Sequence, residues 1–141
     1  MKQLLSFLLA GLIFTATSCS KDDDNGGNSA AVATSLKSGT WHISSYSDNG
    51  VNETDNFSSF TFTFGTSGTV TATNSLLTAT GSWSTGFDDS KDKLDLDFPA
   101  PPLFEELSED WEIVSQTSTQ ISLRHISGGS GETDLLVFQK N

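Results

Sequence analysis

The 141-residue chain has a single cysteine, few basic residues and no apolar run long enough to cross a bilayer. One cysteine excludes a disulfide within the chain, and a domain of this length can fold without one. Seven basic residues against 18 acidic ones argue against a nucleic-acid-binding protein, because phosphate contacts need a basic patch. The net charge of −11 predicts a soluble protein and favours a monomer.

The sequence also lacks the usual catalytic motifs. It has no Gly-x-Ser-x-Gly elbow, no phosphate-cradling glycine loop and no His-Glu-x-x-His pair. The two histidines, His42 and His125, have no partner base or metal that the sequence can place. We therefore expect no enzyme, no catalytic residue, no cofactor and no metal site. If a metal were bound, Asp88, Asp89 and Asp92 would be its expected ligands.

Residues 1–18 have the form of a secretory signal peptide. Lys2 gives a positive start, residues 4–14 are apolar, and residues 16–18 are small and precede Cys19. The apolar run is shorter than the roughly 18 residues that a membrane-spanning helix needs. We expect cleavage before Cys19, which leaves a mature chain one unit more negative than the whole.

Residues 19–35 are expected to be a modified cysteine followed by a flexible acidic tether. The segment is rich in Asp, Asn, Gly, Ser and Ala, and Val32 is its only large apolar residue after Cys19. Such a composition cannot bury enough surface to order itself. The folded domain is therefore expected over residues 36–141.

From Leu36 onward, apolar and polar residues alternate with a period of two. Phe60, Phe62 and Phe64 are separated by threonines, and a similar alternation runs over residues 94–98. This period gives each strand one apolar face and one wet face. Turn signals divide the region into about eight strands, expected near 39–46, 57–64, 68–74, 78–85, 92–98, 109–116, 119–126 and 133–140.

Sequential short strands with short connections predict an all-β antiparallel meander. A meander of about eight strands can close into a small β-barrel without free edges, and an open β-sandwich is the alternative. The best helical candidate in the domain is a single turn near residues 103–107, which follows Pro99, Pro101 and Pro102.

Several short motifs resemble the lipocalin-like domain found on many Bacteroidota lipoproteins. Their order and spacing carry the resemblance over roughly residues 36–141, and they are Gly39-Thr40-Trp41, the Phe-rich 60–64, Gly81-Ser82-Trp83, Asp110 to Ile113 and Leu136 to Lys140. The resemblance implies a small lipocalin-like barrel in which Trp41 packs across one end. Lipocalins cover this Trp with a basic residue, for which Arg124 is the candidate.

The region around Cys19 resembles a bacterial lipoprotein signal, in which the cysteine receives the lipid. Ser20, Lys21, Asp22, Asp23 and Asp24 look like the acidic signal that sends Bacteroidota lipoproteins to the outer face of the outer membrane. The resemblance implies a lipid anchor on Cys19 and a location at the cell surface, with the periplasmic face as the alternative. More than one acyl chain makes such an anchor stable.

The lipocalin-like resemblance implies a non-enzymatic binding protein. A small hydrophobic ligand would lie in the barrel interior, for which the candidate lining residues are Trp41, Phe60, Phe62, Phe64, Trp83, Trp111 and His125. An eight-stranded barrel is just wide enough to hold one small ligand or to be filled by side chains. The alternative is therefore a filled barrel whose loops contact a partner protein or glycan. Rim aromatics would serve that role, namely Tyr46, Phe57, Phe87 and Phe104 with Leu103, unless the last two plug one barrel end.

Overall fold

Alternating apolar and polar residues produce nine strands within residues 27–141, the part of the chain that the computed structural model describes. The strands are β1 Trp41–Asp48, β2 Val51–Asn52, β3 Thr61–Phe64, β4 Thr69–Thr73, β5 Thr78–Asp88, β6 Lys91–Asp97, β7 Asp110–Gln116, β8 Gln120–Ile126 and β9 Thr133–Lys140. Two helices, α1 Gly27–Leu36 and α2 Pro102–Glu105, and the 3-10 turn η1 Thr54–Asn56 complete this part of the chain.

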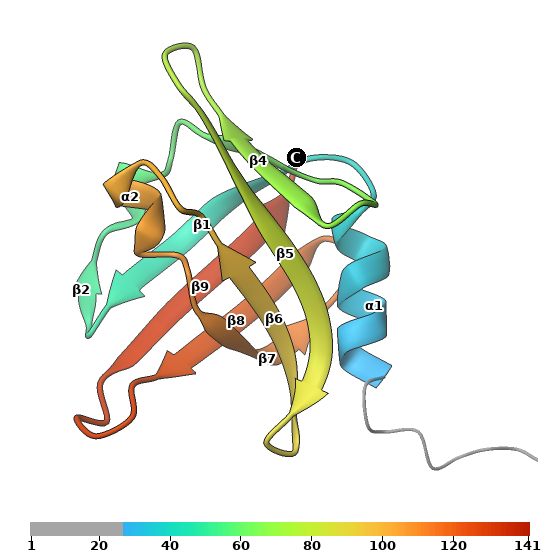
Figure 1. Cartoon of the computed structure of the whole chain (residues 1–141), viewed down its shortest axis with the longest axis vertical. Helices are drawn as coiled ribbons and strands as arrows, with labels where there is room; N and C mark the ends of the chain where they lie inside the picture. Colours follow the sequence, from blue (N-terminus) through green and yellow to red (C-terminus); the bar gives the residue numbers. More distant parts are fainter. Residues whose placement is uncertain (1–26) are drawn as a thin grey trace, which may run out of the picture.

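The strands follow one another around a closed barrel in chain order (Figure 1). Neighbours pair antiparallel, and β9 closes the barrel on β1 through a register that runs from Trp41↔Lys140 to Ser47↔Leu135. The short β2 only extends the end of β1. The predicted meander of eight strands is therefore confirmed. The open sandwich is wrong, because closure pairs the first long strand with the last.

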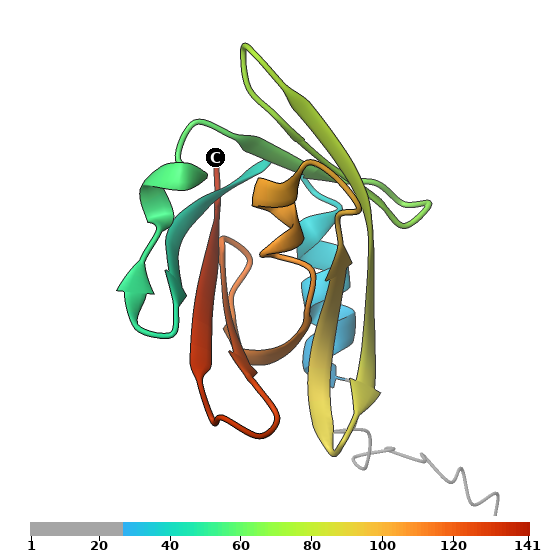
Figure 2. The same ribbon diagram turned by 60° about the vertical axis from the view of Figure 1, so that its left-hand side comes forward.

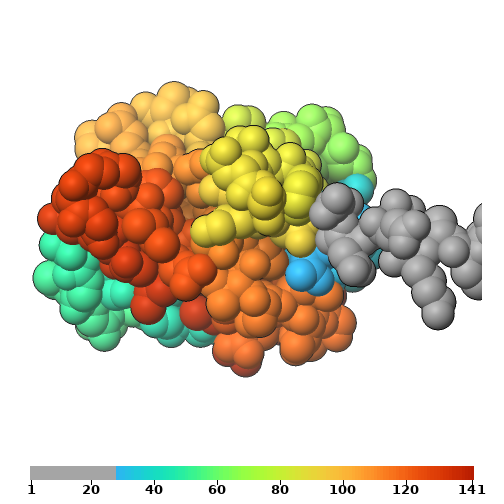
Figure 3. All heavy atoms as spheres, turned by 90° about the horizontal axis from the view of Figure 1, so that it is seen from below, coloured from blue at the N-terminus to red at the C-terminus, as the bar shows by residue number. Residues whose placement is uncertain are grey.

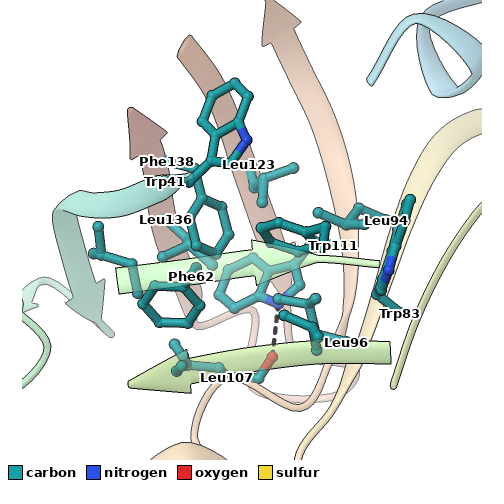
Figure 4. Close-up of a cluster of buried hydrophobic side chains, with 14 of the residues drawn as sticks. Trp41, Phe62, Trp83, Leu94, Leu96, Leu107, Trp111, Leu123, Leu136 and Phe138 are labelled. Carbon is teal, nitrogen blue, oxygen red and sulfur yellow. Dashed lines mark hydrogen bonds between the residues drawn. The ribbon is translucent and has the colours of Figure 1, made fainter. Parts of the chain in front are cut away.

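The inward-facing side chains fill the barrel with aromatic and aliphatic groups. Figure 4 shows tryptophans, phenylalanines and leucines from separate strands gathered in one cluster. Phe62 lies near its centre, with its ring 5.2 Å from that of Phe138 and 6.5 Å from that of Phe98. The Trp111 indole N–H donates to the Leu107 carbonyl at 2.9 Å, so its polar atom is satisfied inside the core. Edge-on ring pairs of this kind add about 0.5–1.5 kcal/mol each beyond the burial of their surface.

Helix α2 covers one end of the barrel. This is the helical turn predicted near residues 103–107. Its Phe104 is fully buried, and its ring lies 5.5 Å from Phe57, 4.9 Å from Phe60 and 5.2 Å from Phe98. The interpretation in which Phe104 plugs the barrel end is therefore confirmed. The alternative of an exposed aromatic rim is wrong for Phe57 and Phe104.

Tyr46 is also buried, contrary to the rim prediction, because of a β-bulge in β1. Strict alternation from Trp41 would place Tyr46 on the outer face. The register against β9 shifts around Ser44, which acts as one extra residue and reverses the alternation. Tyr46 consequently points inward, meets the Phe57 ring edge-on at 5.4 Å and donates its hydroxyl to the Glu106 carbonyl at 3.4 Å.

Helix α1 covers the opposite end, and it corrects the predicted tether over residues 27–35, while residues 19–26 lie outside the described part of the chain. From Gly27 onward this segment is helical, and Val32 and Leu36, one turn apart, are fully buried in the barrel core. The Leu36 carbonyl accepts the Trp41 indole N–H at 3.2 Å. The segment has too few apolar residues to order itself alone, but the finished barrel offers Val32 and Leu36 an apolar surface. In Figure 2, α2 lies in front of the barrel and α1 behind it.

The basic residue over Trp41 is Lys140, not Arg124. The Lys140 ammonium lies 5.5 Å from the centre of the Trp41 ring, and the two residues are register partners in β9 and β1. Arg124 points outward and pairs with Glu112 at 2.9 Å. A cation–π contact at a partly exposed site contributes about 0.5–1 kcal/mol.

Gly81 is expected to tolerate no side chain. A Cβ there would overlap the Asp97 carbonyl oxygen and lie 2.9 Å from the Phe98 ring. Gly81→Ala should lower the free energy of unfolding by about 1–3 kcal/mol, because backbone must move. The corresponding loss in Tm is roughly 4–12 °C in thermal unfolding followed by circular dichroism.

Gly86 in the same strand provides the matched control. A Cβ at Gly86 would meet nothing within 4 Å. Gly86→Ala should therefore leave Tm unchanged or raise it slightly, since alanine restricts the unfolded chain. Equal Tm values for the two alanine variants would contradict the close packing of β5 against β6.

Candidate functional site

Six of the seven side chains predicted to line a ligand cavity are buried in the core. Trp41, Phe60, Phe62, Phe64, Trp83 and Trp111 are each at most 8% exposed. They pack on one another and on their neighbours; the Phe64 ring, for example, meets the rings of Trp83 and Phe138 edge-on at 5.5 Å. The interior placement of these six residues is therefore as predicted, and their contacts are those of a packed core.

The lipidation and export residues, Cys19 and Ser20 to Asp24, lie outside the described residues, so their roles stay predictions. Within residues 27–141, no helix has the length and apolar character needed to cross a membrane. Helix α1 begins at Gly27, eight residues after Cys19. Since an extended chain spans at most about 3.6 Å per residue, the start of α1 lies within roughly 30 Å of Cys19.

The seventh predicted residue, His125, belongs to a polar cluster on the barrel. We call Glu109, Asp110, His125 and Asp134 the His125 cluster. The His125 Nε2 atom lies 3.3 Å from Glu109 Oε2 and 3.7 Å from Asp110 Oδ1. On the other side of the ring, His125 Nδ1 lies 3.5 Å from Asp134 Oδ2. One imidazole is thus surrounded by three carboxylates.

Strand register brings these residues together. The β8–β9 hairpin pairs His125 directly with Asp134, while Glu109 and Asp110 stand at the start of the neighbouring β7. The His125 ring packs on Trp111 with 6.1 Å between ring centres, and its side chain is only 17% exposed. Its Nδ1 atom is buried and has no hydrogen-bond partner among the described residues.

Asp134 and Asp110 are each fixed by a second contact. The Asp134 Oδ1 atom accepts the backbone N–H of Asn49 at 2.9 Å, which leaves Oδ2 facing the imidazole. The Asp110 Oδ2 atom pairs with Lys93 at 3.2 Å, which leaves Oδ1 facing the imidazole. Contacts within the protein therefore orient both carboxylates toward the imidazole.

An ion-pair network borders the cluster on the outer face of the barrel. Glu112 on β7 pairs with Lys91 at 3.0 Å and with Arg124 at 2.9 Å. Burial alone would raise the pKa of Glu112, but the hydrogen bonds from these two cations outweigh it, so the pKa lies below its usual value. A hollow of about 180 Å³ lies among these side chains, Asp110 and His125. Figure 3 shows this side of the molecule, where the yellow turn between β5 and β6 stands beside the orange strands.

Further acidic groups lie close to Asp134 and Tyr46. Burial raises the pKa of Asp48, and a hydrogen bond with the neighbouring Asp134 carboxyl raises it further. Burial and the charge of Glu53 raise the pKa of Glu106 in the same way. In each case burial is the larger cause, and the neighbouring negative charges add to it. This end of the barrel therefore favours a cation over an anion.

The sequence contains a local signal for one part of this cluster. The glycine-rich turn over residues 128–131 is centred so that an antiparallel hairpin pairs His125 with Asp134. The approach of Glu109 and Asp110 follows from the next hairpin, in which β7 pairs with β8 and Glu112 lies opposite Arg124. Its exact register depends on a shift between Ile113 and Ser115 that had no local signal. Asp88, Asp89 and Asp92, the predicted metal ligands, do not converge; within residues 27–141, ligand atoms meet at Glu109, Asp110 and His125.

Comparison with known proteins supports the fold. No protein-family model and no curated protein matches this chain. Among solved structures, the chain is similar to the crystal structure of a DUF4847 family protein from Bacteroides vulgatus, with a TM-score of 0.55 and 19% sequence identity. The match covers 78% of this chain and 97% of that chain. At this identity the likeness shows a shared fold alone, an antiparallel β-barrel that also occurs in Bacteroides.

Proposed function

We propose that this protein is a non-enzymatic lipoprotein of the bacterial outer membrane, and that its filled barrel contacts a partner protein or glycan through its loops. The observation that carries the proposal is the packed interior. Aromatic side chains occupy the space in which a lipocalin-like cup would hold its ligand, and a helix covers each end. The hydrophobic-ligand alternative loses support for the same reason.

Two hollows on the described surface are also poor sites for a hydrophobic ligand. One has about 180 Å³ and is lined mainly by charged residues around Glu112. The other has about 220 Å³ and lies along β5 and β6, where residues 82–84 and 95–97 line it. Pockets for small organic ligands usually have about 300–1,000 Å³ and mostly apolar walls. Recognition by the outer surface is therefore favoured over enclosure.

The turn between β4 and β5 is the best candidate for the contact surface. Its Leu76 is 91% exposed, and Leu77 beside it is 39% exposed. The Asn74 side chain accepts the backbone N–H groups of both leucines, at 2.9 and 2.8 Å, so the turn holds a defined shape. We therefore propose this ordered pair of exposed leucines as the contact point.

The position of this turn fits a lipid anchor at Cys19. In Figures 1 and 2 the β4–β5 hairpin extends beyond one side of the barrel, whereas α1 begins on the opposite side. The chain that leads to Cys19 joins at the start of α1. An anchor there would leave the Leu76 turn facing away from the membrane. The acidic residues 22–24 favour the outer face of the outer membrane, with the periplasmic face as the alternative.

Replacing Cys19 tests the anchor and the location together. In cells expressing the protein, wild type should fractionate with the outer membrane and be digested by protease added outside the cells. Cys19→Ala should appear in the soluble fraction and escape that protease, because the acyl chains that hold a lipoprotein are absent. Ser18→Ala, one residue away, serves as the control and should behave as wild type. Membrane retention of Cys19→Ala would contradict the proposal.

The filled interior predicts that the purified chain neither retains lipid in native mass spectrometry nor binds a fluorescent fatty acid. Phe62→Ala is the positive control, since it opens a cavity at the core centre that can admit an apolar probe. It should cost about 3–5 kcal/mol of stability, so its fold is first checked by circular dichroism. Saturable binding of one fatty acid to wild type would restore the hydrophobic-ligand hypothesis.

A photo-crosslinking amino acid at position 76 tests the contact surface on intact cells. We expect one discrete adduct from position 76. The control is position 114 in β7, where Val114 is 53% exposed but does not lie in the proposed surface. Equal adducts from both positions, or none from position 76, would contradict a partner at the Leu76 turn.

A further inference from the structure

We propose that Glu109, Asp110 and His125 bind one divalent transition-metal ion, for which zinc is the best match, and that Asp134 holds the His125 ring in place. The ligand atoms are His125 Nε2, Glu109 Oε2 and Asp110 Oδ1. This site is independent of the Leu76 turn and of the lipid anchor, so it extends the proposed function without depending on it.

The distances suit a metal ion without rearrangement of the backbone. The three ligand atoms all lie within 4.8 Å of one another, with Nε2 3.3 Å from the Glu109 oxygen and 3.7 Å from the Asp110 oxygen. Zinc bound to nitrogen and oxygen at about 2.0–2.2 Å in tetrahedral geometry holds its ligand atoms roughly 3.3–3.6 Å apart. Small side-chain rotations of the two carboxylates would complete the site.

The second ring nitrogen of His125 gives an independent indication. Nδ1 is buried, has no hydrogen-bond partner among the described residues, and faces Asp134 Oδ2 at 3.5 Å. A histidine that binds a metal through one nitrogen almost always donates the other N–H to a carboxylate or carbonyl. Asp134 favours the proton on Nδ1, which leaves the Nε2 lone pair directed toward Glu109 and Asp110. A metal would tighten this contact by fixing the ring.

Histidine among the ligands selects the kind of ion. Calcium and magnesium prefer oxygen ligands alone, whereas imidazole suits zinc, copper, nickel and iron. Imidazole nitrogen and carboxylate oxygen are both zinc ligands, and three protein ligands leave a fourth position for water. The hollow beside Asp110 and His125 would give that water access to solvent.

Among residues 27–141, Lys93 already neutralises part of the cluster. It pairs with Asp110 Oδ2, on the far side of the carboxylate from His125, so it orients Asp110 without occupying the metal position. Glu109 Oε2 and Asp134 Oδ2 face the imidazole, and Asp48 adds negative charge next to Asp134. A divalent cation would relieve this repulsion between carboxylates.

The test is a zinc titration of the full chain by isothermal calorimetry, in a Cys19→Ser background so that the lone thiol cannot bind the metal. We expect one zinc per chain. His125→Gln should weaken binding at least about 100-fold, because it removes a direct ligand. Asp134→Asn should weaken binding about 10- to 100-fold, as is usual for the residue that orients a metal-binding histidine.

His42→Gln is the matched control, since His42 is the other histidine of the chain and its Nδ1 atom contacts Asn141 instead. It should leave zinc affinity unchanged. Thermal unfolding provides a second readout that also reports folding: zinc should raise the Tm of wild type and of His42→Gln, but not that of folded His125→Gln. Absence of saturable zinc binding, or equal affinity in wild type and His125→Gln, would overturn the proposal. Calcium binding as tight as zinc binding would also overturn it, because it would indicate carboxylates without the histidine.

Discussion

The register between β1 and β9 joins the first and last long strands of a sheet whose apolar face would otherwise meet water. Because Trp41 pairs with Lys140 and Ser47 with Leu135, every long strand has a partner on both sides. Closure turns one face of the sheet into an interior, and that interior must be filled by side chains or by a ligand. Here the large aromatic residues fill the interior, so closure of the barrel produces a packed core.

The two barrel ends follow from closure. A barrel of this size leaves apolar side chains exposed at both openings. A short helix covers each opening and buries one or two of its own apolar side chains there. Phe104 of α2 packs among Phe57, Phe60 and Phe98, and Val32 and Leu36 of α1 pack at the other end. Because both ends are occupied, we propose that recognition uses the outside of the molecule, at the exposed Leu76 turn and the polar His125 cluster.

The His125 cluster shows how strand register can assemble chemistry from residues with no common motif. A hairpin places His125 against Asp134, and the adjacent strand brings Glu109 and Asp110 to the other side of the ring. The Trp111 ring packs edge-on against the imidazole. Lys93 orients Asp110, and the backbone N–H of Asn49 orients Asp134. The result is a preorganised set of ligand atoms on a rigid sheet, separate from the proposed contact surface.

The sequence alone determined the eight long strands of this protein. Strict alternation and glycine-rich turns specified eight strands, their order and the single helical turn after the prolines, because these signals are local. It also carries the lipid and export predictions at Cys19 and residues 20–24, which rest on short motifs. The tertiary structure decided what depends on distant residues: the bulge that turns Tyr46 inward, the helix built on Val32 and Leu36, and Lys140 over Trp41. Each of these needs a surface or partner that exists only after the barrel closes, so no local pattern could specify it.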